Sequence, residues 1–460
     1  MISYIFLLFA LIVIAVIAFF VFKKDFMAPS FITAVVYAIS VSAAIVGFLS
    51  WNSHGELSLM TIAIVILGVV GVFFGELFQR KISTKVFGKK KKDNIESVGK
   101  IANSKEIGNR IPIWVLAVTS VFVLATIVLT YFEIRRVCLH YSHNPTGLTD
   151  MLSFYRTKTL LFGTEAVSSG VTINFFVQQM QKICYFVAVF YMYFFIDFLQ
   201  EKKKKSWLRI FMYLSTILMV FALTLLTSSR SLMMHLCIAF AVLYIMIRRR
   251  AKGRDNNMEK KRVVRKVAIV GIPAIIVFYL LTPIMGRADN MNFVDYMTFY
   301  IGTPVPSLDY ALENKTLEDG KGFGANTFYG VYYSLAKMGI SESYPEPNRE
   351  GVVYGKYGGS NVYTSFSSYY LDFGLLGVVI LSFLFGWLTS TIYELVKRKN
   401  YNVFGLVLFA YYFYVLIDQV RGDLFYSLIS VSTISYIVIA FLLYKAYGFL
   451  AKEEKCVEQK

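Results

Sequence analysis

Long apolar stretches, separated by shorter polar ones, run along almost the whole chain. A helix needs about 20 consecutive apolar residues to cross the hydrocarbon core of a bilayer. Eleven stretches come close to this length, and we predict a transmembrane helix for each of them. They cover residues 2–22, 31–50, 58–77, 111–131, 173–199, 207–226, 231–247, 267–285, 369–395, 401–420 and 424–445.

Lysine and arginine collect in every second polar gap. The clusters lie at residues 23–24, 89–92, 202–205, 248–250 with 260–266, and 397–399. Short cytoplasmic loops of membrane proteins carry an excess of these two residues. All eleven stretches obey one alternation, which predicts an N-terminus outside the cell and a C-terminus in the cytoplasm.

The composition agrees with a membrane protein. Of the 460 residues, 57% are hydrophobic and only 17% are charged, which is too little polar surface for a soluble fold. The formal net charge of +18 follows from the cytoplasmic clusters, which also attract anionic lipid headgroups. The four cysteines form no CxxC pair, so neither a disulfide framework nor a metal knuckle is indicated. We expect one all-helical membrane domain over residues 1–460, with membrane lipids and not nucleic acid as its surroundings.

Two sizeable segments are predicted to lie outside the cell. The first is residues 132–172, and the second is the large external loop at residues 286–368. The large loop is rich in tyrosine, and its residues 328–338 have the pattern of a short amphipathic helix at the membrane surface. The tyrosines could form an aromatic belt that anchors the loop, or they could shape an external cavity. Their number favours the cavity.

Arginines mark helix boundaries on the external side. Arg230 lies in the sequence TSSRSL, between two predicted spanning helices. An ionised side chain at membrane depth is costly, and it is a functional hypothesis by default. Each arginine could instead reach lipid phosphates, and Arg421 could form an ion pair with Asp418 or Asp423. Together they predict a site for a lipid-linked phosphate or pyrophosphate, because guanidinium binds phosphate bidentately. These arginines are Arg156, Arg230, Arg287 and Arg421.

A pyrophosphate on a polyprenyl lipid is a leaving group for glycosyl transfer, and its developing charge needs fixed positive charge. The external segments contain no DxD or paired-carboxylate motif suited to a metal, so we expect arginines to supply that charge. A general base would deprotonate the acceptor hydroxyl, and no single residue stands out for this role. Candidates on the external side are His140, His143, Asp372, Asp418 and Asp423.

Residues 358–386, GGSNVYTSFSSYYLDFGLLGVVILSFLFG, carry a resemblance to a known family. An N-[VT]-Y-[TS] opening, an aromatic run and D-F-G-x-x-G entering a helix resemble the end of the large external loop in Wzy-type polymerases. These enzymes polymerise repeat units of O-antigens and capsules. TSSRSLMM resembles the arginine hairpin of that family, and Arg156 and Arg421 match in placement. The related O-antigen ligases carry a histidine where this chain has Asn361 and Tyr363, which favours a polymerase and leaves the base unassigned.

The resemblance implies a fold, a location and a reaction. The expected fold is GT-C-like, and the expected location is the bacterial cytoplasmic (inner) membrane. The enzyme would be a metal-independent glycosyltransferase without a cofactor, and its substrate an oligosaccharide on undecaprenyl pyrophosphate. It would work beside a chain-length regulator and a flippase. The expected catalytic residues are Arg230, Arg421 and Asp372, and the expected substrate-binding residues are Arg156, Arg287, Asn361 and Tyr363.

A flippase for lipid-linked oligosaccharides, or another polysaccharide transporter, is the alternative. Transporters often show two related halves and charges at mid-membrane. The sequence shows no convincing inverted repeat, and a carrier leaves the large external loop unexplained. A passive scaffold of an export complex would not need arginines at external helix ends.

Overall fold

The computed structural model describes residues 1–51, 55–88, 111–158, 173–200, 206–252, 279–280, 291–317, 322–340, 351–397 and 402–458. Within these residues, nine helices are long and apolar enough to cross a membrane. The protein is therefore a mostly helical, multi-pass membrane protein. The chain forms two compact units. Unit 1 comprises residues 1–98, 290–396 and 415–434, and unit 2 comprises residues 99–289, 397–414 and 435–460.

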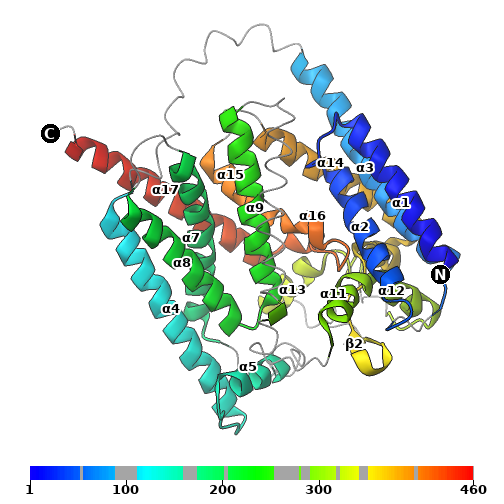
Figure 1. Cartoon of the computed structure of the whole chain (residues 1–460), viewed down its shortest axis with the longest axis horizontal. Helices are drawn as coiled ribbons and strands as arrows, with labels where there is room; N and C mark the ends of the chain where they lie inside the picture. The colour runs from blue at the N-terminus through cyan, green and yellow to red at the C-terminus, as the bar shows by residue number, and fades with distance from the viewer. Residues whose placement is uncertain are drawn as a thin grey trace. The chain divides into compact units, whose positions relative to one another are not determined.

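Unit 1 is built on four long helices that pack side by side (Figure 1). They are α1 (Ile2–Val21), α2 (Pro29–Val46), α3 (Leu59–Gly88) and α14 (Ser365–Val396). Shorter elements gather at the end of this unit where α1 begins (Figure 1). They are α11 (Phe293–Gly302), α12 (Pro304–Glu313), α13 (Tyr329–Lys337), β1 (Val352–Val353), η4 (Gly355–Tyr357), β2 (Gly359–Ser360) and η5 (Tyr426–Leu428).

Glycines let α3 and α14 approach each other closely. A Cβ on Gly75 would lie 2.1 Å from the carbonyl oxygen of Phe383, and one on Gly386 would lie 2.2 Å from that of Val72. Small residues on facing helices are the usual means of close packing in membranes, where van der Waals contact replaces the hydrophobic effect. The pair α3–α14 is thereby the tight centre of unit 1.

A backbone break divides α14 into a short first part and a long spanning part. Gly374 has φ 62° and ψ −160°, which are not helical angles. Only glycine adopts this region readily. The break falls in the D-F-G motif, so the motif marks a change of helix direction.

The segment predicted to be the large external loop contributes a folded part to unit 1. Trp51, Phe299 and Tyr354 pack edge to face, with ring centroids 5.5 to 5.6 Å apart. The Tyr354 hydroxyl is 2.8 Å from Ser307 Oγ. Burial raises the pKa of Tyr354, so its phenol stays protonated. The two-residue strands β1 and β2 flank Tyr354 in the chain and pair antiparallel, with Val352 opposite Ser360.

Buried charges join the helices of unit 1 at the end where α1 leads into α2. Glu76 on α3 accepts hydrogen bonds from Ser30 N (2.8 Å) and Ser30 Oγ (2.7 Å) on α2. Arg80 Nε donates to the other oxygen of Glu76 at 3.0 Å. Tyr393 of α14 donates to Asp25 at 2.8 Å. A charge inside a membrane protein has to be paired in this way.

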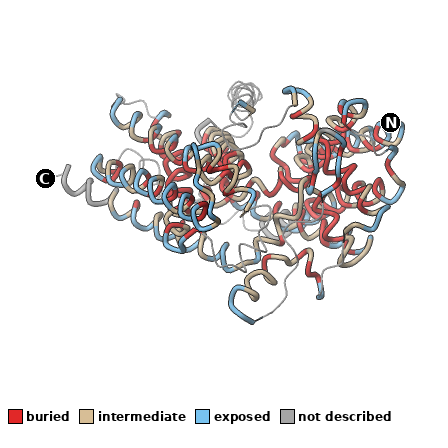
Figure 2. The backbone as a smooth tube through the Cα atoms, turned by 90° about the horizontal axis from the view of Figure 1, so that it is seen from below, coloured by how far each residue is buried: buried red, intermediate tan, exposed pale blue. Residues whose placement is uncertain are grey.

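Unit 2 is arranged around α7 (Phe175–Gln200), which is mostly buried. It packs against α4, α8, α9 and α15, and Figure 2 shows buried residues inside each unit and exposed ones on the outer helix faces. The other helices of unit 2 are α4 (Ile113–His140), α5 (Leu148–Arg156), α8 (Trp207–Leu226), α9 (Arg230–Lys252), α15 (Val403–Tyr412) and most of α17 (Val431–Glu458).

Several predicted stretches differ from the structure, and one lies almost entirely outside the described residues. The tenth stretch, residues 401–420, is not one spanning helix. It forms α15 and the short α16 (Tyr414–Asp418), and at about 1.5 Å per residue the two together are shorter than a bilayer core. Helix α4 continues nine residues beyond the predicted end at 131, into the first external segment. The eighth stretch, residues 267–285, lies outside the described residues except for 279–280.

Candidate functional site

A cavity of about 380 Å³ lies in unit 1. The described residues that line it come from α13 and the chain just before it, the chain after β2, the start of α14, the chain between α16 and α17, and the start of α17. Their side chains include five serines, two asparagines, three tyrosines, one arginine and one aspartate. The cavity brings together four residues singled out in the sequence, namely Asn361, Tyr363, Arg421 and Asp423.

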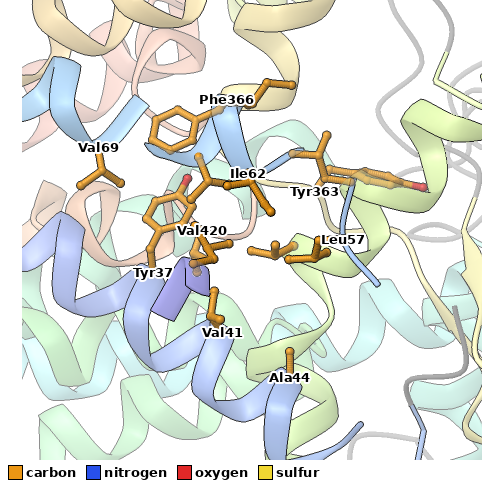
Figure 3. Packing of buried hydrophobic residues seen from close by; sticks show 14 of the residues in the cluster. Tyr37, Val41, Ala44, Leu57, Ile62, Val69, Tyr363, Phe366 and Val420 are labelled. Atoms are coloured by element: carbon orange, nitrogen blue, oxygen red, sulfur yellow. The ribbon is translucent and has the colours of Figure 1, made fainter. Parts of the chain in front are cut away.

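The position of Arg421 is set by the turn that ends α16. The Arg421 N–H donates to the Asp418 carbonyl oxygen at 2.8 Å. The carbonyl oxygen of Gln419 accepts from Ser365 N at 2.8 Å and from the Tyr37 hydroxyl at 3.2 Å. These bonds attach the turn to α14 and α2, and Val420 packs into the same hydrophobic cluster as Tyr37 (Figure 3). Arg421 therefore extends from a fixed backbone.

The guanidinium of Arg421 keeps hydrogen-bonding capacity. Its Nη1 lies 3.8 Å from Asp418 Oδ2, which is an ion-pair distance and too long for a hydrogen bond. Arg421 Nε is buried and has no hydrogen-bond partner among the described residues. The side chain is 29% exposed, whereas that of Asp418 is 4% exposed. This arrangement suits an arginine that binds an anion entering the cavity.

Asp423 also lines the cavity, and it organises the chain that follows. Its Oδ1 accepts from Phe425 N at 3.1 Å and Tyr426 N at 3.2 Å, at the start of η5. The Tyr369 hydroxyl donates to the same oxygen at 3.3 Å. Burial, and then the nearby Asp423 carboxylate, raise the pKa of Tyr426. Tyr426 therefore stays a hydrogen-bond donor, and it donates to the Leu381 carbonyl oxygen at 2.8 Å.

Asn361 and Tyr363 differ in exposure. Asn361 directly follows β2 and is exposed. Tyr363 is only 3% exposed and packs in the cluster that contains Leu57, Ile62 and Phe366 (Figure 3). Asn361 can thus offer its amide to a ligand, and Tyr363 supports the wall of the cavity.

Helix α13 forms another part of the wall through Tyr329 and Tyr333. It sits directly on η5, because a Cβ on Gly330 would lie 2.2 Å from the Ser427 carbonyl oxygen. Ser334 Oγ accepts from Val431 N at 3.1 Å, where α17 begins. The predicted amphipathic segment is therefore a helix, and two of its tyrosines face the cavity.

Asp372, predicted to be catalytic, is not among the residues that line the cavity. Its Oδ1 accepts from Asn326 N at 3.2 Å and Asn326 Nδ2 at 2.9 Å, and its Oδ2 accepts from Thr327 N at 2.6 Å. Asn326 does line the cavity. Asp372 therefore shapes the cavity indirectly, by holding the backbone at Asn326 and Thr327 in place.

Arg230, the other predicted catalytic arginine, belongs to unit 2 and follows a tight helix hairpin. Ser229 N donates to Thr224 O at 3.2 Å, and Ser228 N donates to Leu225 O at 3.0 Å. Ser228 has φ 50°. This is a Schellman ending of α8 with a serine at the position that glycine usually takes. Arg230, only 6% exposed, begins α9 immediately afterwards.

Arg156 lies at the same end of unit 2 as the hairpin. Its neighbour Tyr155 belongs to a hydrophobic cluster of α4, α5 and α7, and Leu226 at the end of α8 packs against that cluster. Arg156 therefore belongs to a helix whose cluster reaches the end of α8, four residues before Arg230 in the chain. Arg287 lies outside the described residues.

The two histidines of the first segment predicted to be external, considered above as bases, are in different surroundings. His143 lies 3.1 Å from Asp150 and stacks on Phe154 at 4.1 Å between ring centroids. His140 makes an edge-to-face contact with Tyr141. Among the described residues, no group of three His, Cys, Asp or Glu side chains could hold a metal ion.

Sequence reasoning missed Asn326, Tyr329 and Tyr333 as individual residues of the site. The spacing of four between the two tyrosines was the available signal, because residues at i and i+4 share one helix face. The link between Asp372 and Asn326 crosses 46 positions and leaves no local pattern.

Comparison with known proteins does not extend this description. No protein-family model matches the chain, and neither a curated protein nor a solved structure is significantly similar to it.

Proposed function

We propose that the protein is an oligosaccharide repeat unit polymerase of the Wzy type. It joins repeat units carried on undecaprenyl pyrophosphate, at the external face of a bacterial cytoplasmic membrane, into a surface polysaccharide such as an O-antigen or a capsule. The orientation, the GT-C-like architecture and the partners named above are parts of the same proposal.

The observation that carries the proposal is the cavity of unit 1. It combines an arginine, which suits phosphate, with serine hydroxyls, asparagine amides and tyrosines, which suit a polyhydroxylated ligand. A ligand that is anionic at one end and hydroxylated over the rest matches both parts. A lipid-linked oligosaccharide pyrophosphate is such a ligand.

The reaction is a nucleophilic substitution at an anomeric carbon. The acceptor hydroxyl oxygen forms a bond to this carbon, and the bond between the carbon and the pyrophosphate oxygen breaks. The hydroxyl proton passes to a general base, and the undecaprenyl pyrophosphate leaves with its bonding electron pair. In this proposal Arg421 and Arg230 stabilise the charge that develops on the departing pyrophosphate.

The test uses the purified full chain and a synthetic polyprenyl-pyrophosphate-linked repeat unit without added metal, with polymer length followed on gels. We expect the wild-type protein to make polymer and Arg421→Ala to lose about 100-fold or more in rate, as enzymes do when a donor to a developing anion is removed. Arg421→Lys should recover only part of the rate, because an ammonium lacks the bidentate geometry.

Arg136→Ala is the matched control, because Arg136 is a surface arginine that pairs with Glu133 and does not line the cavity. It should keep the wild-type rate. Normal polymerisation by Arg421→Ala would refute the role of the arginine. If the protein moved the lipid-linked substrate between vesicle leaflets and made no polymer, the carrier would be the better assignment.

A further inference from the structure

One wall of the cavity consists of neutral groups that surround the site of Arg421 with hydroxyls and amides. Tyr329 and Tyr333 lie one turn apart on α13, and their rings stack at 5.8 Å between centroids and 22° between planes. The Lys337 ammonium lies over the Tyr333 ring at 4.7 Å from its centroid. This ladder of side chains holds the Tyr333 ring in place along the cavity.

Asn326 completes this wall, and its amide is oriented by Asp372. The amide nitrogen donates to Asp372 at 2.9 Å. One N–H of the amide is engaged in this way, and the amide oxygen is a hydrogen-bond acceptor of the kind that a sugar hydroxyl can use. Tyrosine hydroxyls and serine hydroxyls both donate and accept, so the wall can satisfy a ligand with hydroxyls in several orientations.

The position of Asp372 supports a holding role. It lies at the end of the first part of α14, two residues before the break at Gly374. A carboxylate at the C-terminal end of a helix is disfavoured by the helix dipole. Three donated hydrogen bonds from Asn326 and Thr327 offset this cost.

We propose that Asn326, Tyr329 and Tyr333 form a subsite for the neutral saccharide portion of the substrate, with Asp372 as the residue that positions Asn326. This inference rests on the proposed function, because it assigns the sugar part of the same lipid-linked substrate. Tyr333 and Asn326 are then determinants of sugar specificity, and Arg421 binds the pyrophosphate of the same substrate.

The first test measures binding of sugar without pyrophosphate. The probe is the free oligosaccharide released by mild acid from the lipid-linked repeat units that accumulate in the host after deletion of the gene. Calorimetry on the detergent-solubilised full chain should show binding by the wild type. Tyr333→Ala and Asn326→Ala should weaken it about tenfold each, the effect of losing one or two buried hydrogen bonds.

Two variants control for folding. Tyr333→Phe keeps the ring stack and removes only the hydroxyl, so it should also weaken sugar binding while the melting temperature stays unchanged. Tyr300→Phe removes a hydroxyl from a tyrosine of the same external loop that does not line the cavity, and it should bind as the wild type does. Wild-type sugar affinity in Tyr333→Ala and Asn326→Ala, or absence of binding by the wild type, overturns the subsite.

The second test separates positioning from base catalysis at Asp372. Asp372→Asn replaces an acceptor oxygen by an NH₂ group that faces the N–H donors of Asn326 and Thr327. Asn326 is then no longer held in position, so KM for the lipid-linked substrate should rise while the shape of the pH–rate profile stays unchanged. Loss of the acidic limb of that profile at unchanged KM would instead identify Asp372 as the general base and overturn its positioning role. Failure of the wild type to polymerise would refute the proposed function, whereas the sugar-binding test judges the subsite independently.

Discussion

Ser228 carries the conformational strain of the hairpin that precedes Arg230. It is a non-glycine residue at φ 50°, at the position of a Schellman ending where glycine is preferred. Left-handed backbone costs a residue with a Cβ about 1 kcal/mol. The chain accepts this conformational cost with a serine where a glycine would avoid it. We infer that the hydroxyl residues of the hairpin provide a polar environment next to Arg230. They are Thr227, Ser228, Ser229 and Ser231.

We expect Ser228→Gly to relieve this strain and to raise the melting temperature slightly, by an amount that corresponds to about 1 kcal/mol or less. Ser228→Val should lower it, because a β-branched residue is most restricted at positive φ. The measurement is a thermal melt of the detergent-solubilised protein, with Ser215→Gly inside α8 as a control that should destabilise. A Ser228→Gly protein that melts below the wild type would contradict the strained assignment.

Single residues also show what the sequence could predict about the site. Arg421, Asn361 and Tyr363 were accessible to prediction, because a charge at a helix end and a motif at the end of a loop are local features. Asp372 was noticed for the same reason, but its partners Asn326 and Thr327 lie more than 40 positions away. A hydrogen bond of that span depends on the folded chain and cannot be derived from a local pattern.

At the scale of helices, length and apolarity predicted most of the spanning elements, since the bilayer core fixes the length required. The tenth stretch was predicted wrongly because apolar residues line a protein interior as well as a lipid-facing surface, and hydrophobicity does not separate the two. Helix α4 was predicted too short because polar residues end an apolar stretch without ending a helix. Arg136 there pairs with Glu133, one turn away.

The buried charges between α2 and α3 allow a quantitative prediction at this scale. Glu76 is fully buried, and Arg80 neutralises it from one turn away. Arg80→Leu leaves an uncompensated carboxylate, and we expect a loss of about 3–5 kcal/mol in stability. Glu76→Gln in the same protein removes the charge, so the double variant should be more stable than Arg80→Leu alone.

Thermal melts of the three proteins test this pairing. Arg136→Ala is again a suitable control, because the Arg136 side chain is 53% exposed and exposed ion pairs contribute about 0–1 kcal/mol. An Arg80→Leu protein as stable as the wild type would mean that Arg80 is not needed to compensate the buried Glu76, which bonds to Ser30 on α2.

For the whole molecule, the question is whether the arginines act together. Arg421 belongs to unit 1 and Arg230 to unit 2, and under the proposed polymerase function both serve one departing pyrophosphate. Groups that stabilise the same charge in one transition state are coupled, so their removal is not additive in free energy. A carrier forms no glycosidic bond and has no leaving group, so no such coupling is expected if the protein is a carrier.

A double-mutant cycle of Arg230→Ala and Arg421→Ala, scored by the rate of polymer formation, tests this prediction. If both guanidiniums stabilise the same leaving group, the double variant should lose far less than the product of the two single losses, since either removal already disables the shared step. Rates that multiply would mean that the arginines serve separate steps, such as binding of two different substrates. In that case Arg421 would keep its place in the cavity of unit 1, and Arg230 would need a different anion.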